Sequence, residues 1–183
     1  MIYKREDASK DAAMHVAKQM VAAAVTAPKG CGIDNIEAVI VDGKEKDILA
    51  KHMRDIAAET GADFFNRDAG NVDNSYCVVL IGANNAPIEL DDCSLCGFEN
   101  CGRTIEAGAN CAFNIVDLGI AIGSAVSLAA DNRIDNRVLF SAGKAALRMD
   151  LFSDNVSVIF GIPLAATSKS IFFDRETEDV TGE

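Results

Sequence analysis

Four of the six cysteines in this 183-residue chain lie between positions 93 and 111, and this crowding is the strongest constraint on its fold. The spacing is Cys93-x2-Cys96-x4-Cys101-x9-Cys111. Four thiolates close together can hold zinc tetrahedrally, or can hold an iron–sulfur cluster through four iron–thiolate bonds. Disulfide bonds or unreactive free thiols would also account for the crowding.

The compartment argues against disulfides. The N-terminus, "MIYKREDASKD", has no apolar run behind its basic residues, so we expect no signal peptide. No uninterrupted apolar stretch reaches the roughly 18 to 20 residues of a membrane span. We therefore expect a cytoplasmic protein without a membrane span, whose thiols stay reduced. The net charge of −11 argues against a nucleic-acid partner, because phosphate binding needs clustered Lys and Arg.

Two features of the cysteine pattern favour iron over zinc. Structural zinc sites usually carry two separated cysteine pairs, whereas three cysteines here form one arc and Cys111 adjoins a helical pattern. Gly97, directly after Cys96, would let backbone amides approach and hydrogen-bond to sulfur. We expect a four-iron–four-sulfur cluster held by Cys93, Cys96, Cys101 and Cys111. Zinc and free thiols remain alternatives.

The remaining cysteines and the two histidines show no comparable pattern. Cys77 lies in an apolar strand pattern and is typical of a core residue. Cys31, between Gly30 and Gly32, is more simply an incidental loop thiol than a reactive one. His15 and His52 lie on separate helical segments, and the sequence shows no obvious partner for either.

The apolar periodicity predicts a domain of alternating helices and strands. Helices are expected at 8–26, capped by Ser9 or Asp7, at 43–61, ended by Gly61, at 112–131, and at 135–149, capped by Asp135; strands are expected at 36–41, 75–83, 155–164 and 169–174. The segment 112–131 is apolar nearly all round, which predicts a central helix buried on most sides. Apolar strands alternating with helices imply a sheet covered on both faces. The predicted fold is α/β (α+β) with a mixed sheet, as one domain (1–183) with a cysteine-rich iron–sulfur segment inserted at 90–112.

The motif "CSLCGFENCGRTIEAGANC" resembles the small four-iron–four-sulfur domain of Rnf-type electron-transport subunits and corrinoid iron–sulfur proteins. That domain has Cys-x2-Cys-Gly-x3-Cys, a short helix with a glycine, and a last cysteine. The last cysteine is closer in this chain. Over nearly its full length the sequence resembles the uncharacterised ferredoxin-domain proteins of bacteria and archaea, through "TAPKGCGIDNI", the cysteine arc, "DLGIAIGSA" and "DNRVLFSAGKAA".

A more distant resemblance is to the flavin-dependent nitroreductases, carried by "AAAVTAPKGCGIDNIEAVIV", "NIVDLGIAIGSAVSLAA" and "SVIFGIPL". It implies a nitroreductase-like fold and a homodimer with FMN in the interface clefts. "YKRED" is a poor substitute for the arginine-rich motif that grips the flavin phosphate in that family. If FMN binds, Lys29, Gly30 and Asn35 are the candidate residues. A glycine-containing turn without a ligand fits the same loop equally well.

Three functions remain open from the sequence. The first is an iron–sulfur redox protein, acting in electron transfer or as an oxidoreductase, with a redox partner protein or a small-molecule electron acceptor. The alternative is a non-enzymatic interaction or regulatory protein with a structural zinc or cluster site. The third is a redox sensor. No Ser/His/Asp triad, Walker loop or HExxH motif supports hydrolytic or phosphoryl chemistry, and no catalytic residue is assigned.

Overall fold

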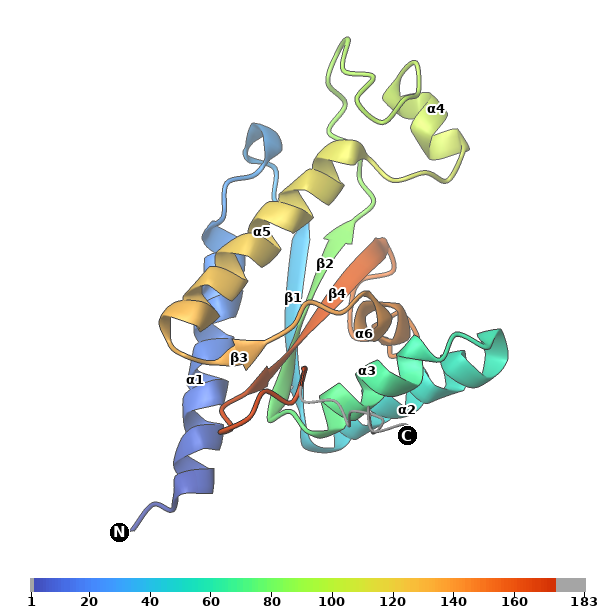
Figure 1. Cartoon of the computed structure of the whole chain (residues 1–183). Coiled ribbons are helices and arrows are strands. Elements are labelled where there is room, and N and C mark those ends of the chain that lie inside the picture. The colour runs from blue at the N-terminus through green and yellow to red at the C-terminus, as the bar shows by residue number, and fades with distance from the viewer. Residues whose placement is uncertain (1, 174–183) are drawn as a thin grey trace, which may run out of the picture.

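The computed structural model describes residues 2–173. A four-stranded sheet lies between two layers of helices (Figure 1). Across the sheet the strand order is β1 (Ile36–Asp42), β2 (Cys77–Asn84), β4 (Val156–Ala165) and β3 (Asp135–Asn136). The three longer strands confirm the predictions at 36–41, 75–83 and 155–164.

The two faces of the sheet bury separate hydrophobic cores. Helices α1 (Arg5–Thr26) and α5 (Ala112–Asp131) cover one face, and α2 (Gly43–Thr60), α3 (Phe64–Asp73) and α6 (Phe140–Ala146) cover the other. Successive side chains of β2 point to opposite faces of the sheet, as in any β-strand. Val79 and Ile81 pack with α1 and α5, whereas Val78 and Leu80 pack with the other layer. Burial on both faces explains the uninterrupted apolar run of this strand.

The expected mixed sheet is wrong in one respect: every strand pair among the described residues is antiparallel. The reason is α3, a helix that the sequence did not predict. A single helix between β1 and β2 would return the chain to the start of β1 and give a parallel pair. Here α2 carries the chain away from the end of β1, and α3 carries it back to that end. Strand β2 therefore begins beside the end of β1, where Asp42 pairs with Cys77.

Two predictions near the C-terminus are also wrong. The helix expected at 135–149 is a short strand, β3, followed by α6, and Asp135 pairs with Ala165 instead of capping a helix. Helix α6 packs so closely on β4 that a Cβ on Gly143 would lie 1.7 Å from the carbonyl oxygen of Ile159. Residues 169–173 form bends and turns instead of a strand, and residue 174 lies outside the described residues.

Helix ends agree only in part with expectation. The first helix begins at Arg5 with Lys4 at its N-cap and no side-chain cap, so neither Ser9 nor Asp7 caps it. Helix α2 ends as predicted at Gly61, whose φ of 72° suits glycine.

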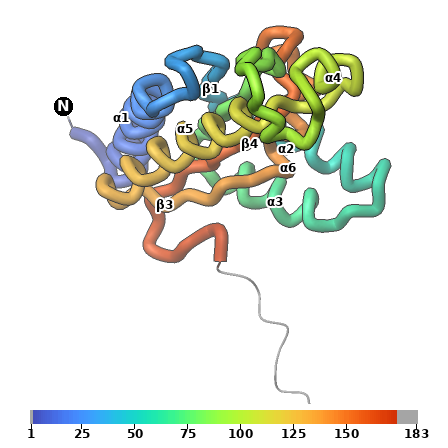
Figure 2. The backbone as a smooth tube through the Cα atoms, turned by 90° about the horizontal axis from the view of Figure 1, so that it is seen from above, coloured from blue at the N-terminus to red at the C-terminus, as the bar shows by residue number. Residues whose placement is uncertain are grey.

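Helix α5 has the predicted length but is buried on one side only. Its outward face exposes apolar residues, among them Ile115, Val116 and Ile120. By length and composition α5 is also the one described helix apolar enough to cross a membrane; here its other face packs against α1 and the sheet. Figure 2 shows α5 lying lengthwise beside α1.

Candidate functional site

The cysteine-rich segment leaves the sheet at the end of β2 and returns at the start of α5 (Figure 1). It contains one short helix, α4 (Cys101–Glu106), among turns. Two of the predicted ligands therefore sit at helix starts: Cys101 is the first residue of α4, and Cys111 is the N-cap of α5. Cys93 and Cys96 lie in the preceding turns.

All four predicted ligands line one cavity of about 350 Å³. Their thiols are free, and aromatic side chains of Phe98 and Phe113 also line the space. A single tetrahedral zinc ion would draw its sulfur ligands to about 3.8 Å from one another, given zinc–sulfur bonds of about 2.3 Å. Over residues 2–173 no three Cys, His, Asp or Glu side chains converge closely enough to hold one ion. Four thiols around one cavity are a ligand set that either a zinc ion or an iron–sulfur cluster can use.

Left-handed backbone positions curl the segment around the cavity. Asp92, Ser94 and Gly97 have φ values of 53°, 43° and 85°. The amide of Gly97 donates to the carbonyl oxygen of Ser94 at 3.0 Å, which closes the turn that holds Cys96. The glycine that the sequence singled out thus shapes this turn, since its conformation is one that other residues adopt at a cost.

Hydrogen-bond donors lie beside the sulfur of Cys96. Its Sγ lies 3.2 Å from the hydroxyl oxygen of Thr104, a residue only 1% exposed. This hydroxyl and then the backbone amide of Phe98 lower the pKa of the Cys96 thiol, because both stabilise the thiolate. Asn100 caps α4 by accepting from the amide of Arg103 at 3.1 Å, and so fixes the helix that carries Thr104.

Asparagine side chains attach the C-terminal end of the segment to the loop after β2 and to strand β4. Asn85 donates to the carbonyl oxygen of Ala109 at 3.1 Å, and Asn110 accepts from the hydroxyl of Ser157 at 2.6 Å. Sequence reasoning missed this role. The available signal was the concentration of asparagines in "GANNAP" and "GANCAFN", directly before and after the cysteines.

Asn114 is the most connected of these asparagines. It is 1% exposed and donates to the backbone carbonyls of Asn84 and Ala86 at 2.9 and 2.8 Å. Its Oδ1 accepts from Asn35 at 3.1 Å. One buried side chain thus joins helix α5, the root of the cysteine segment and the loop after α1.

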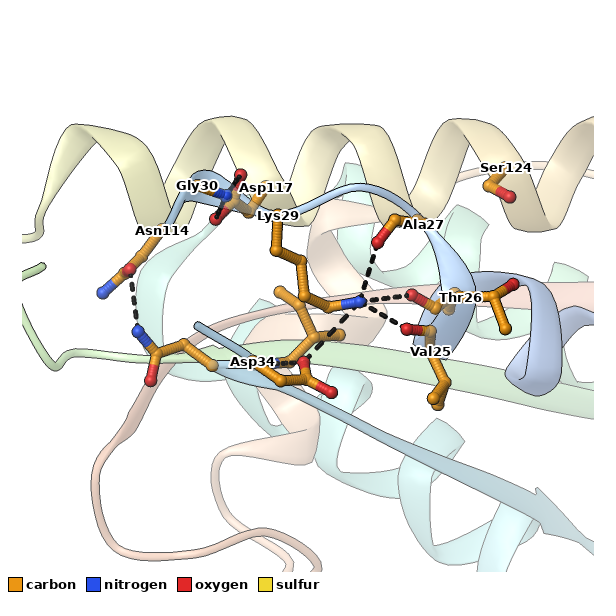
Figure 3. A network of polar contacts seen from close by, with 12 residues as sticks. Val25, Thr26, Ala27, Lys29, Gly30, Asp34, Asn114, Asp117 and Ser124 are labelled. Atoms are coloured by element: carbon orange, nitrogen blue, oxygen red, sulfur yellow. Dashed lines mark hydrogen bonds and ion pairs between the residues drawn. The ribbon is translucent and has the colours of Figure 1, made fainter. Parts of the chain in front are cut away.

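That loop carries the predicted cofactor residues, and Figure 3 shows how Lys29 is used. Its ammonium group donates to the carbonyl oxygens of Ala24, Val25 and Ala27 at 3.1, 2.6 and 3.0 Å. It also pairs with Asp34 at 3.7 Å, and its side chain is 6% exposed. Lys29 closes the C-terminal end of α1, a role that the sequence did not suggest.

Gly30 and Asn35 fasten the same loop to α5. The amide of Gly30 donates to both carboxylate oxygens of Asp117, at 3.1 and 3.0 Å, and that carboxylate is buried (Figure 3). A Cβ on Gly30 would lie 3.1 Å from the ring of Phe113, which lines the cysteine cavity. The structure therefore brings the two predicted sites next to each other, with Phe113 between them.

The two other cysteines lie apart from the cavity. Cys31 is exposed, in the 3-10 turn η1 (Gly30–Gly32), with a left-handed φ of 54°. Cys77 is fully buried in β2, as predicted, and burial raises the pKa of its thiol to about 12.

A second pocket, of about 620 Å³, lies at the start of α1. The polar residues that line it are Lys4, Arg5, Glu6, Ser9, Tyr76, Thr167 and Ser168. Two cations, a helix N-terminus and several hydroxyls are groups that bind phosphate. By sequence, "YKRED" is a poor substitute for the arginine-rich motif of the nitroreductases. The sequence does not show that the hydroxyls of residues 167 and 168 come to lie beside it.

Comparison with known proteins supplies the family. Residues 107–175 match the family described as "Uncharacterized protein containing a ferredoxin domain" (DUF2148). A protein of Archaeoglobus fulgidus, itself described as uncharacterized, is 39% identical over 96% of this chain and 98% of its own length. The chain belongs to the ferredoxin-domain family.

Solved structures show the fold of this ferredoxin-domain protein. A nitroreductase with bound FMN from Desulfitobacterium hafniense superposes with a TM-score of 0.57 at 16% identity, over 93% of this chain and 82% of the other. An FMN-dependent nitroreductase from Clostridium difficile gives 0.54 at 17% identity, over 92% and 79%. The nitroreductase-like fold predicted from the sequence is confirmed, and the predicted ferredoxin-domain family with it.

Proposed function

We propose that this ferredoxin-domain protein is a redox protein that holds a four-iron–four-sulfur cluster on Cys93, Cys96, Cys101 and Cys111. The observation that carries the proposal is that all four thiols line one cavity while the other two cysteines do not. A cluster bound there would accept and release single electrons. The chain itself would supply four sulfur ligands, hydrogen bonds to Cys96, and aromatic rings that exclude water.

The residues around the cavity support a proposal about the electron partner. Asp91, Asp92 and Glu99 line it together with Leu95, which is 57% exposed. Ile105, on the nearby α4, is also 57% exposed. An apolar patch among carboxylates favours a partner protein or small acceptor with positive charge, and electron transfer to it should slow as ionic strength rises.

A flavin is the second element of the proposal. The ammonium group of Lys29 is already used at the end of α1, so it could contact FMN only by leaving three carbonyl oxygens. The pocket with Lys4 and Arg5 offers charge and hydroxyls together and is the better candidate for a phosphate. It lies at the opposite end of the 22-residue α1 from Gly30 and Asn35, about 33 Å away, so one FMN within one chain would not reach both. Gly30 and Asn35 would then act by holding the loop beside Phe113.

The test is anaerobic reconstitution with iron and sulfide, followed by metal analysis and visible spectra before and after dithionite. We expect four irons per chain and a broad absorbance that bleaches on reduction. We expect this absorbance to be lost when any one of the four cavity cysteines is replaced by serine. The variants Cys31→Ser and Cys77→Ala should keep it. Zinc without redox activity would refute electron transfer and favour a structural role in an interaction or regulatory protein.

A further inference from the structure

The hydroxyl group of Thr104 lies between two acceptors. Thr104 is the one buried residue of α4, where it is 1% exposed. Its Oγ1 lies 3.2 Å from Cys96 Sγ and 3.4 Å from the carbonyl oxygen of Asn100. A buried hydroxyl needs a partner, and a helical threonine ordinarily donates to the carbonyl four residues back. Here the sulfur is the nearer of the two acceptors.

Coordination would decide which acceptor is used. A hydroxyl has one hydrogen and can make one normal donation. A thiol can itself donate, so the free protein permits either direction between Thr104 and Cys96. A thiolate that ligates metal has no proton and can only accept. The hydroxyl would then point at the sulfur.

The backbone holds Thr104 in this position. Its amide donates to the carbonyl oxygen of Asn100 at 3.3 Å, and its carbonyl oxygen accepts from the amide of Ala109 at 3.0 Å. The side chain of Asn100 caps the same helix. The hydroxyl is thus set in place by α4 before any ligand binds, and forming the bond requires little rearrangement.

Resting on the cluster proposed above, we infer that Thr104 sets the reduction potential of the site through a hydrogen bond to Cys96 Sγ. Reduction adds one electron and therefore one negative charge to the cluster and its sulfur ligands. A donor beside sulfur stabilises the reduced state more than the oxidised state, so it raises the potential. Thr104 is a positioning residue, because it acts through Cys96.

The experiment is an anaerobic redox titration of the full-length, reconstituted protein with Thr104→Val and Thr104→Ser. Valine keeps the shape and removes the donor; serine keeps the donor and removes the methyl group. We expect Thr104→Val to lower the midpoint potential by about 59 mV. At a fixed applied potential this corresponds to an about tenfold lower ratio of reduced to oxidised cluster, for a one-electron step. Thr104→Ser should stay near the wild type.

Three outcomes would overturn the inference. The first is an unchanged midpoint potential in Thr104→Val, and the second is a shift of that variant to higher potential. The third is an equal shift in Thr104→Val and Thr104→Ser, which would indicate an effect of packing. Should Thr104→Val fail to hold iron, Thr104→Ala replaces it, because alanine favours the helix and also lacks the hydroxyl. A wild-type protein that binds no redox-active cluster overturns the proposed function; a loaded cluster with an unmoved potential overturns the role of Thr104 alone.

Discussion

Lys29 combines a buried charge with three backbone acceptors at the end of α1. We expect Lys29→Met to lower the free energy of unfolding by about 2 kcal/mol, because hydrogen bonds from a cation to the C-terminal carbonyls of a helix are lost. Urea denaturation measures the change. Lys18→Met, at an exposed position of the same helix, is the matched control and should change little. Equal stability of both variants would contradict the capping role.

Cys77 predicts a particular pH dependence. Burial raises the pKa of its thiol to about 12 in the folded protein, against about 8.5 in an unfolded chain. Below the unfolded pKa both states hold the proton, so the contribution of Cys77 to stability is complete. As pH rises from about 8.5 toward 12, the unfolded chain releases its proton first, and stability falls by about 1.4 kcal/mol per pH unit.

The measurement is urea denaturation of the wild type and Cys77→Ala at several pH values from neutral to alkaline. Alanine lacks the thiol, so the stability advantage of the wild type should shrink as pH rises. The exposed Cys31 serves as the control, and Cys31→Ala should track the wild type at every pH. A constant difference between wild type and Cys77→Ala would show that the thiol is accessible to solvent.

At the scale of the elements, Asn114 of α5 connects the loop after α1 to the loop after β2, where the cysteine segment begins. We expect Asn114→Ala to lower the free energy of unfolding by about 2 kcal/mol, since the carbonyls of Asn84 and Ala86 and the side-chain amide of Asn35 each lose a part-buried hydrogen bond. Hydrogen exchange should speed up in residues 29–35 and 84–88 together.

The control for Asn114 is Asn132→Ala at the other end of α5. Asn132 is exposed, and its side chain donates to the carbonyl oxygen of Leu128, within its own helix turn. This variant should leave exchange at both loops unchanged. Faster exchange at one loop alone after Asn114→Ala would mean that the side chain does not couple them.

The elements also show what a sequence can predict. Strands β1, β2 and β4 and helices α1, α2 and α5 follow from apolar periodicity, which is a local property. Helix α3, "FFNRDAGNVD", has Gly70 and several Asn and Asp residues, all weak helix formers, and it forms because Phe65 and Val72 pack under α2. Strand β3 exists only through its pairing with β4, a long-range contact without a local signal.

The candidate site divides in the same way. Cysteine spacing selected four cysteines as ligands, and all four line the cavity; that they bind metal stays a prediction. It could not predict Thr104 or Asn114, because their roles depend on which acceptors the fold brings within reach. Lys29 illustrates the opposite case: its charge suggested a ligand, and its position at a helix end gave it a structural partner instead.

At the scale of the whole molecule, the exposed apolar face of α5 predicts self-association. Ile115, Val116 and Ile120 are 38–51% exposed on one helix, more than is usual for apolar residues scattered singly over a surface. We propose that two copies pack through this face, and expect Ile120→Glu to shift a dimer to monomer in analytical ultracentrifugation. Ile48→Glu, at a residue of similar exposure on the opposite layer, should leave the dimer intact. A wild-type monomer would refute the proposal.

Neither hydrophobic core, as far as the described residues show, takes a side chain from residues 85–110. The hydrophobic packing that stabilises the sheet and its helices therefore does not depend on the cysteine segment. A cluster destroyed by oxygen would leave a folded scaffold behind, with its asparagine attachments still in place. With the proposed cluster, such a protein need not be degraded and made again after damage. Iron, sulfide and a reductant that returns the four cysteines to thiols would restore it, so the protein would outlast any single cluster.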